Sequence, residues 1–218
     1  MGLPSPGTPF SNKGILMTVM PPLKTSPEVK NDLHSDSFQT PAKSNRFTRG
    51  YVQVYTGNGK GKTTAAIGLA MRAAGAGLKV IIVQFMKSGN YSEIKALEKY
   101  SGHITVEQYG TGKFLTDRPT EMDLSFTAKG LYHVKAAASS GKYQVIILEE
   151  ANMAVLCGLL SVDDLLDVIE TRRPDTEIVI TGRYAHPKII DAADLVTEMK
   201  EVKHYYTRGI QARTGIEK

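Results

Sequence analysis

The segment YTGNGKGKTT, residues 55–64, decides the fold of this chain of 218 residues. It follows the extended run Tyr51–Tyr55 and leads into an alanine-rich segment, Lys62–Ala74, which stops at Gly75 and Gly77. A strand, a glycine loop and a helix in that order bring backbone N–H groups together around an anion at the positive end of the helix. The segment therefore predicts a loop that holds phosphate groups.

The spacing of this loop departs from the usual Walker A pattern, G-x-x-x-x-G-K-[ST]. Counted back from Gly61, the first glycine should stand at position 56, which is a threonine, and Gly57 comes one residue late. We interpret the loop as a shortened Walker A, in which Lys62 reaches the phosphates and the Thr63 hydroxyl ligates Mg²⁺. The alternatives are a glycine-rich turn that only joins strand to helix and, for Lys60, a solvated surface lysine. The predicted ligand-binding residues are Gly57, Asn58, Gly59, Lys60, Gly61, Lys62, Thr63 and Thr64.

After the loop, apolar strand-like runs alternate with helical segments. Most of these runs are apolar almost throughout, as in strands that are covered on both faces. We therefore expect an α/β fold of the three-layer P-loop NTPase (RecA-like) type, with a mainly parallel central sheet and helices on both faces. The predicted strands are 51–55, 80–85, 104–108, 145–148, 178–181 and 195–196.

Two later helices begin with capping boxes. Thr120 and Asp123 begin a helix that ends at Gly141, and Ser161 and Asp164 begin another that stops at an Arg-Arg-Pro sequence. The residues predicted to face the core are Leu124, Ala128 and Leu131 in the first helix and Leu165, Leu166 and Ile169 in the second.

A predicted acidic site follows the fourth strand. Residues 143–150, YQVIILEE, read as an apolar strand ending in Glu149 and Glu150, where P-loop proteins carry acids near the metal. Adjacent residues on a strand point to opposite faces, so at most one of the two readily ligates Mg²⁺. The alternative is a pair of solvated acids at a strand end.

The charge, the cysteine content and the apolar stretches of the chain limit the classes of function that it can have. The net charge of +5 is spread along the chain without blocks of Lys and Arg, which does not indicate nucleic-acid binding and fits an acidic ligand or an acidic partner protein. Cys157 is the single cysteine, so no intrachain disulfide forms, and its apolar surroundings predict a small buried hydrophobe. We see neither a secretion signal nor an apolar stretch of about 18 residues, and expect a soluble cytoplasmic protein without a membrane partner.

Residues 1–45 contain seven of the ten prolines and little periodicity. They predict a flexible N-terminal extension, whose apolar patch at 15–20 could dock elsewhere. Residues 46–218 then form one P-loop domain.

Several motifs occur in a fixed order along the chain, and together they resemble the P-loop type of ATP:corrinoid adenosyltransferase over about residues 50–218. These are the glycine loop, Gln84-Phe85, the Leu-Glu-Glu strand end, Thr181-Gly182-Arg183 with His186, the segment ADLVTE at 193–198, and Val202-Lys203-His204 with Gly209 and Gly215-Ile216.

The resemblance implies transfer of the 5′-deoxyadenosyl group of ATP to the cobalt(I) of a reduced corrinoid, cobalamin or cobinamide, with release of triphosphate, in adenosylcobalamin synthesis or salvage. The family binds ATP in the reverse direction across its shortened loop, so that the 5′-carbon faces the cobalt. Cobalt(I) needs no general base, and the enzyme must align the carbon and stabilise the departing charge. The resemblance assigns that task to Lys62, to Thr63 and Glu150 as Mg²⁺ ligands, and to Arg183, for which a capping or surface arginine is the alternative.

The resemblance also implies an apolar wedge against the lower face of the corrinoid, which makes cobalt easier to reduce by removing its axial ligand. Phe114 is the candidate wedge, with core packing as the alternative, because some relatives carry a tryptophan in this stretch and this chain has none. A reduced flavoprotein such as flavodoxin would supply the electron, and the enzyme would be a homodimer. We interpret His186 and His204 as hydrogen-bonding scaffold and not as cobalt ligands.

Two other functions remain open at this stage. A P-loop small-molecule kinase or ATPase would favour a full-length Walker A and an arginine-bearing lid over the phosphates. A non-catalytic nucleotide switch would keep the phosphate loop without a site for the corrinoid.

Overall fold

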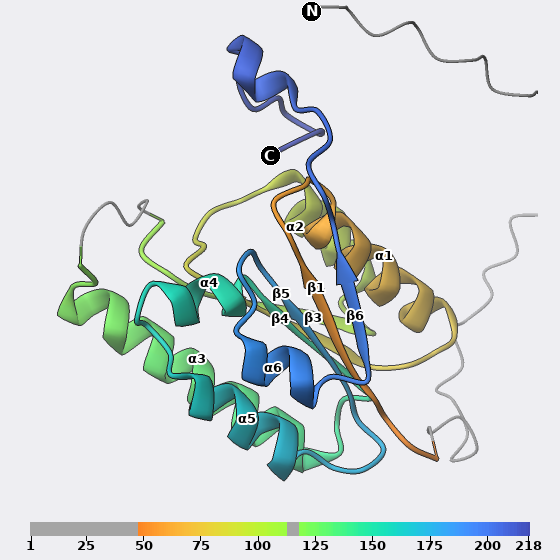
Figure 1. Ribbon diagram of the computed structural model, residues 1–218. Coiled ribbons are helices and arrows are strands. Elements are labelled where there is room, and N and C mark those ends of the chain that lie inside the picture. Colours follow the sequence, from red (N-terminus) through yellow and green to blue (C-terminus); the bar gives the residue numbers. More distant parts are fainter. Residues whose placement is uncertain (1–47, 113–117) are drawn as a thin grey trace, which may run out of the picture. The chain divides into compact units, whose positions relative to one another are not determined.

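In the computed structural model, which describes residues 48–112 and 118–218, six strands form one sheet in the order β3-β2-β4-β5-β1-β6 (Figure 1). All neighbouring strands pair in parallel. β5 lies between β1, which leads into the glycine loop, and β4, which ends in the acidic pair. One intervening strand between these two motif-bearing strands is typical of RecA-like P-loop folds, so the predicted fold class is confirmed. The strands are β1 Val52–Thr56, β2 Val80–Phe85, β3 Ile104–Tyr109, β4 Val145–Glu149, β5 Glu177–Thr181 and β6 Leu195–Glu198.

The predicted long helices are also confirmed, with ends within one residue of those expected from the sequence. Periodicity missed three helices of six residues each, α2, α4 and α6, because fewer than two turns give no repeating apolar pattern. The helices are α1 Lys62–Gly75, α2 Ser92–Leu97, α3 Glu121–Ser140, α4 Ala151–Leu156, α5 Val162–Thr171 and α6 Pro187–Ala192, with 3₁₀ turns η2 Glu98–Tyr100 and η3 Tyr205–Arg208.

The helices form two layers, one on each face of the sheet (Figure 1). α1 and α2 cover one face, where the alanines Ala66, Ala70 and Ala73 let α1 pack closely onto strand residues such as Ile147. The helices α3 to α6 cover the other face. Strand residues alternate between the two layers, which explains why the central strands are apolar throughout.

The capping boxes define the helix ends as predicted. The Thr120 hydroxyl accepts a hydrogen bond from the Asp123 N–H at 3.3 Å, and the Ser161 hydroxyl accepts one from the Asp164 N–H at 3.0 Å. Gly141 ends α3 in the left-handed region at φ 67°.

The predicted inner face of α3 is wrong. Leu124 is 44% exposed and Ala128 is exposed as well, while Leu131 is half-buried. The buried face instead includes Thr127, Val134 and Gly130, where a Cβ would stand 2.8 Å from the Tyr109 ring and 3.0 Å from the Phe85 ring. The helix turns this face inward because only small residues allow it to approach two buried aromatic rings. The sequence prediction looked for apolar side chains and therefore overlooked glycine and threonine. The core residues predicted in α5 are confirmed: Leu165 and Ile169 are buried, and Leu166 packs against them half-buried.

The structure also bears on the cysteine and on membrane-spanning helices, but not on the N-terminal extension. Cys157 packs half-buried against the α3 to α6 core, and burial raises the pKa of its thiol. No helix in the described ranges is long and apolar enough to cross a bilayer. The predicted extension, residues 1–45, lies outside the described residues, so its boundary with the domain stays a prediction.

Candidate functional site

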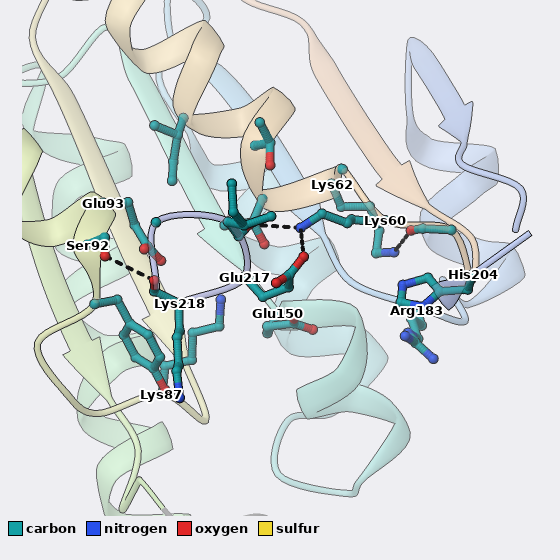
Figure 2. A pocket seen from close by; sticks show the side chains of 18 residues that line it. Lys60, Lys62, Lys87, Ser92, Glu93, Glu150, Arg183, His204, Glu217 and Lys218 are labelled. Carbon is teal, nitrogen blue, oxygen red and sulfur yellow. Dashed lines mark hydrogen bonds and ion pairs between the residues drawn. The ribbon is translucent and has the colours of Figure 1, made fainter. Parts of the chain in front are cut away.

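The glycine loop borders a cavity of about 620 Å³ at the carboxyl end of the sheet (Figure 2). This volume is within the range of roughly 300–1,000 Å³ that small-molecule sites occupy. Loop residues 59–64, Glu150 and Arg183 all line the cavity, so the structure brings these predicted residues together. Gly57 and Asn58 belong to the loop but not to the cavity lining, and the predicted wedge Phe114 lies outside the described residues.

The loop closes around its own lysine. Lys62 is 8% exposed, and its ammonium group donates to the carbonyl oxygens of Gly57 and Gly59, both at 2.7 Å. A lysine ammonium has three donors, so one remains for a ligand. Burial and then the nearby Arg183 lower the pKa of Lys62, and the carboxylates of Glu149 and Glu150 oppose that shift.

The outer side of the loop is pressed against the segment that follows β6. The Gly59 N–H donates to the Met199 carbonyl at 2.6 Å. A Cβ on Gly57 or on Gly59 would lie 2.5 or 2.7 Å from that carbonyl oxygen. These two glycines therefore allow the loop to pack against the Met199 backbone as well as to turn tightly. The Gly59 N–H points away from the cavity.

The loop ends at the N-terminus of α1, where the helix dipole is positive. Within the described chain no side chain caps this terminus and its first turn holds no acidic residue. The N–H groups of the first turn, from Lys62 onward, are thus available to an anion. Gly61, at φ 122°, makes the turn that a residue with a Cβ would adopt only under strain.

The acidic pair divides into a buried and a cavity-lining carboxylate. Glu149 is 1% exposed and accepts three hydrogen bonds, from the hydroxyls of Thr63 and Thr181 and from the ammonium of Lys87. Glu150 lines the cavity, and its left-handed backbone, φ 60°, marks the change from β4 to α4. Burial and then the charge of Glu149 raise the pKa of Glu150.

The oxygen groups at this site suit Mg²⁺ that is bound together with a substrate. They do not suit a metal ion that is bound by protein side chains alone. The described residues contain no group of three His, Cys, Asp or Glu side chains that could hold a metal ion. Mg²⁺ prefers oxygen ligands and is usually bound by one or two protein groups together with substrate phosphates and water. The Thr63 hydroxyl and the Glu150 carboxylate are oxygen groups of this kind, at a helix terminus suited to phosphate.

Arg183 extends from the end of β5 at the edge of the cavity (Figure 2). The preceding Gly182 has φ 126°, and its carbonyl accepts a hydrogen bond from the Asn152 side chain at 3.2 Å, which fixes the turn. Among the described residues the Arg183 guanidinium, which is exposed, makes no hydrogen bond or ion pair. Arg183 therefore places a cation beside the glycine loop that is available to a ligand.

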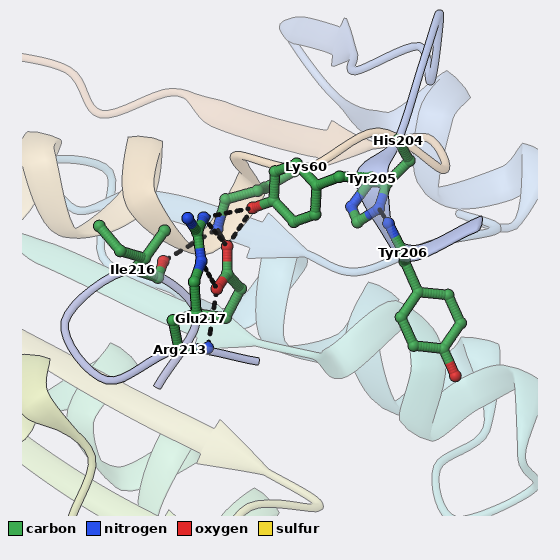
Figure 3. Close-up of polar contacts among 7 residues, drawn as sticks. All are labelled: Lys60, His204, Tyr205, Tyr206, Arg213, Ile216 and Glu217. Atoms are coloured by element: carbon green, nitrogen blue, oxygen red, sulfur yellow. Dashed lines mark hydrogen bonds and ion pairs between the residues drawn. The ribbon is translucent and has the colours of Figure 1, made fainter. Parts of the chain in front are cut away.

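The C-terminal residues 215–218 form another wall of the cavity, and Figure 3 shows the polar contacts between this segment and Lys60. Lys60 donates to the Ile216 carbonyl at 2.9 Å and lies 3.5 Å from the Glu217 carboxylate. Hydrogen bonds from Arg213 and then from Tyr205 hold the pKa of Glu217 at about 2. Lys60 is therefore partly engaged by the C-terminal segment, although its side chain is 41% exposed. No local pattern predicts this contact, because it joins residues 156 positions apart.

Lys87 is a cavity residue that the sequence reasoning missed. Its ammonium lies 3.2 Å from the Glu149 carboxylate. A signal did exist, since Lys87 lies just after the carboxyl end of an apolar strand, and Glu149 and Glu150 lie at the carboxyl end of another. Carboxyl ends of neighbouring parallel strands meet at one edge of the sheet.

The two histidines have the scaffold role that was predicted. The ring nitrogen Nδ1 of His186 accepts from the Lys188 N–H at 3.2 Å and caps α6. Nδ1 of His204 accepts from the Tyr206 N–H at 3.0 Å and caps η3. His204 also lines the cavity.

Comparison with known proteins shows what this chain is similar to. Residues 48–217 match the family model described as ATP:corrinoid adenosyltransferase BtuR/CobO/CobP. A corrinoid adenosyltransferase of Pseudomonas aeruginosa is 35% identical over 174 residues, which is 79% of this chain and 85% of the relative. Corrinoid adenosyltransferases of Escherichia coli K12 and of Salmonella typhimurium, the latter called CobA, are each 34% identical over 171 residues, 78% of this chain and 86% of the relative.

Proposed function

Because the chain belongs to the ATP:corrinoid adenosyltransferase family, and so transfers the adenosyl group of ATP to a corrinoid in cobalamin synthesis or salvage, we propose how its own residues carry out that transfer. The cobalt(I) electron pair attacks the 5′-carbon of ATP, a cobalt–carbon bond forms, and the bond from C5′ to the α-phosphate oxygen breaks. The electron pair of that bond leaves on the oxygen of inorganic triphosphate. The protein has to hold the carbon in line and to stabilise the departing anion.

The observation that carries this proposal is the shortened loop with its lysine folded inside. Three residues separate Gly57 from Gly61, where a Walker A has four, and Lys62 closes the loop by bonding to two of its carbonyls. Such a loop supports ATP bound in reverse, with its terminal phosphate on the loop and the 5′-carbon toward the open side. A kinase or ATPase needs the opposite orientation, in which the terminal phosphorus faces the acceptor.

Charge stabilisation falls to the cations around the cavity. The Lys62 ammonium keeps one donor for phosphate, the first-turn amides of α1 add partial positive charge, and Arg183 is free to move onto the triphosphate. Lys60 would first have to leave Glu217 and the Ile216 carbonyl. We therefore assign Lys62 and Arg183 the larger share and Lys60 a smaller one.

Mg²⁺ would be held by Thr63 and Glu150 together with phosphate oxygens. The Thr63 hydroxyl donates its hydrogen to Glu149, so its oxygen lone pairs remain available to the metal. When bound, Mg²⁺ neutralises part of the triphosphate charge. The role of Glu149 is then to orient Thr63 rather than to bind the metal.

The corrinoid and the protein partners are further parts of the proposal. The cavity is of a size for a nucleotide, so the corrinoid ring has to lie against its open side, with Phe114 as the proposed wedge beneath it. An acidic reduced flavoprotein such as flavodoxin would deliver the electron to a chain of net charge +5. We also propose that the protein is a cytoplasmic homodimer.

The test is to incubate the protein with ATP, Mg²⁺ and chemically reduced cobalamin or cobinamide under anaerobic conditions. We expect a light-sensitive cobalt–carbon bond and one inorganic triphosphate for each adenosyl group transferred. Recovery of ADP and phosphate would point to a kinase or ATPase, and nucleotide binding without either product would point to a switch. Lys62→Ala, as the matched variant, should lose transfer.

A further inference from the structure

Lys87 stands in a part of the backbone that the fold holds under strain. Met86, just before it, has φ 59°, in the left-handed region that residues with a Cβ rarely adopt. The Met86 N–H donates to the Tyr109 carbonyl at 3.0 Å, and Gly110 lies directly against this turn. A Cβ on Gly110 would be 2.4 Å from the Met86 carbonyl carbon and 2.5 Å from the Lys87 nitrogen. Strain of this kind clusters at functional sites, where it aims a side chain.

The turn directs the Lys87 side chain into the cavity from the side away from Lys60 and Arg183 (Figure 2). The side chain is 22% exposed, and its ammonium lies 3.2 Å from the carboxylate of the buried Glu149. One of its three N–H donors is used in that bond, and no other hydrogen bond of Lys87 occurs within the described residues. Two donors therefore remain on an ammonium group that borders the cavity.

Three other cations at the cavity either bond to protein groups or lie on the opposite wall. Two donors of Lys62 hold loop carbonyls, and Lys60 is bound by the C-terminal segment. An anion bound on the glycine loop would meet Arg183 on one side only. Of the cavity-lining cations in the described residues, Lys87 and Lys218 remain. Of these two, only the Lys87 ammonium has a partner in the described chain that holds it in place, so Lys87 can face the anion from the other side while keeping its bond to Glu149.

We propose that Lys87 is a further catalytic residue, which binds the triphosphate group of ATP through its two remaining donors and stabilises that group as it departs. The inference rests on the proposed function, because it requires that the whole triphosphate leaves. Glu149 anchors the ammonium, so little side-chain entropy is lost on binding. The cation that pairs with the buried acid thus also contacts the substrate.

A simpler role has to be separated from this one. Lys87 could act only by neutralising Glu149, whose uncompensated charge would repel the triphosphate. The two roles predict different effects of Lys87 on triphosphate binding once Glu149 is uncharged. In a Glu149→Gln background, a cation that serves only as a counter-ion has nothing left to neutralise, whereas a cation that contacts triphosphate still matters.

The experiment measures the binding of inorganic triphosphate to the full chain by calorimetry, without corrinoid and both with and without Mg²⁺. The key comparison is Glu149→Gln against the double variant Lys87→Met/Glu149→Gln, which removes both charges together and so leaves no unpaired charge in the buried site. We expect the double variant to bind triphosphate about 10- to 100-fold more weakly, the usual effect of one charge-assisted contact. Equal affinities, within about twofold, would overturn the proposal.

Two controls complete the design. Lys135→Met removes a lysine whose ammonium pairs with Asp167 at 2.6 Å on the helical surface, and it should leave triphosphate binding unchanged. Lys87→Arg keeps a cation with several donors and should retain most of the affinity. An Arg variant that binds as weakly as the Met variant at matched thermal stability would count against a contact with triphosphate.

The kinetic arm varies ATP at a saturating concentration of reduced cobalamin. Stabilisation of the departing group lowers kcat in Lys87→Met, whereas a structural defect confined to ATP binding raises KM alone. Because the calorimetry needs no turnover, the two proposals can fail separately. If Lys87 supports triphosphate binding but no cobalt–carbon bond forms, the proposed function fails and the assignment of Lys87 as a triphosphate ligand stands.

Discussion

The substitution Gly110→Ala tests whether the strained turn at the end of β2 is held by close backbone packing. The added Cβ would stand 2.4 Å from the Met86 carbonyl carbon and 2.5 Å from the Lys87 nitrogen. Carbon atoms in normal contact are about 3.5–4.0 Å apart, so the overlap is roughly 1 Å or more. Both neighbours are backbone atoms and cannot rotate away. The ends of the paired strands β2 and β3 would have to separate.

The magnitude follows from two costs. Overpacking in a well-packed region costs about 1–3 kcal/mol. Separation of the strand ends also weakens the hydrogen bond from the Met86 N–H to the Tyr109 carbonyl, 3.0 Å long, which contributes about 1 kcal/mol. We therefore expect Gly110→Ala to lower the free energy of unfolding by about 2–4 kcal/mol.

The assay is urea unfolding followed by circular dichroism, with the free energy of unfolding taken at an unchanged slope. Gly102→Ala is the matched control, because a Cβ at Gly102 would meet nothing within 4 Å. The control should stay within about 0.5 kcal/mol of wild type. If both variants are equally stable, the backbone contact at Gly110 does not constrain the turn, and the reasoning about how Lys87 is aimed is refuted.

Three further predictions follow from single residues. Gly68→Ala should raise the free energy of unfolding by about 0.5–1 kcal/mol in the same urea assay, because Gly68 is exposed within α1 and a Cβ there meets nothing within 4 Å; a loss of stability would contradict this. The raised pKa of Glu150 means that the native state binds more protons than the unfolded state above pH about 4.5, so this carboxyl makes stability fall as pH rises. Glu150→Gln should remove that fall, so the variant should be more stable than wild type at neutral pH, and it should lose Mg²⁺-dependent transfer. Urea midpoints measured across pH and a transfer assay would check these two effects. Equal midpoints for variant and wild type at all pH values would contradict the predicted effect on stability. Lys62→Ala should bind triphosphate at least about 10-fold more weakly in calorimetry, since it loses a charged donor to phosphate, and unchanged binding would remove the loop lysine from the site.

The parts of the fold that could be predicted depend on local signals. The strands β2, β4 and β5 are apolar runs buried on both faces, and the capping boxes at Thr120 and Ser161 use residues three positions apart. The glycine loop is also local, since a strand, a turn and a helix follow one another directly. Such features need no knowledge of what packs against them.

The parts that could not be predicted depend on distant packing. The buried face of α3 is selected by contact of Gly130 with the Tyr109 ring, which lies on β3, and apolarity alone favours Leu124 instead. The contact of Lys60 with Ile216 joins opposite ends of the described domain. Lys87 lies between these cases, because its position at a strand end was visible in the sequence but its partner Glu149 was not.

Cleavage of the bond between C5′ and oxygen is tested most directly with ATP that carries ¹⁸O at the bridge between C5′ and the α-phosphorus. The products formed with reduced cobalamin are examined by ³¹P NMR, in which ¹⁸O shifts the resonance of the phosphorus that bears it. Attack at carbon predicts that the released inorganic triphosphate carries the label on a terminal phosphorus. Label retained in ADP or AMP would show attack at phosphorus and would contradict adenosyl transfer at this site.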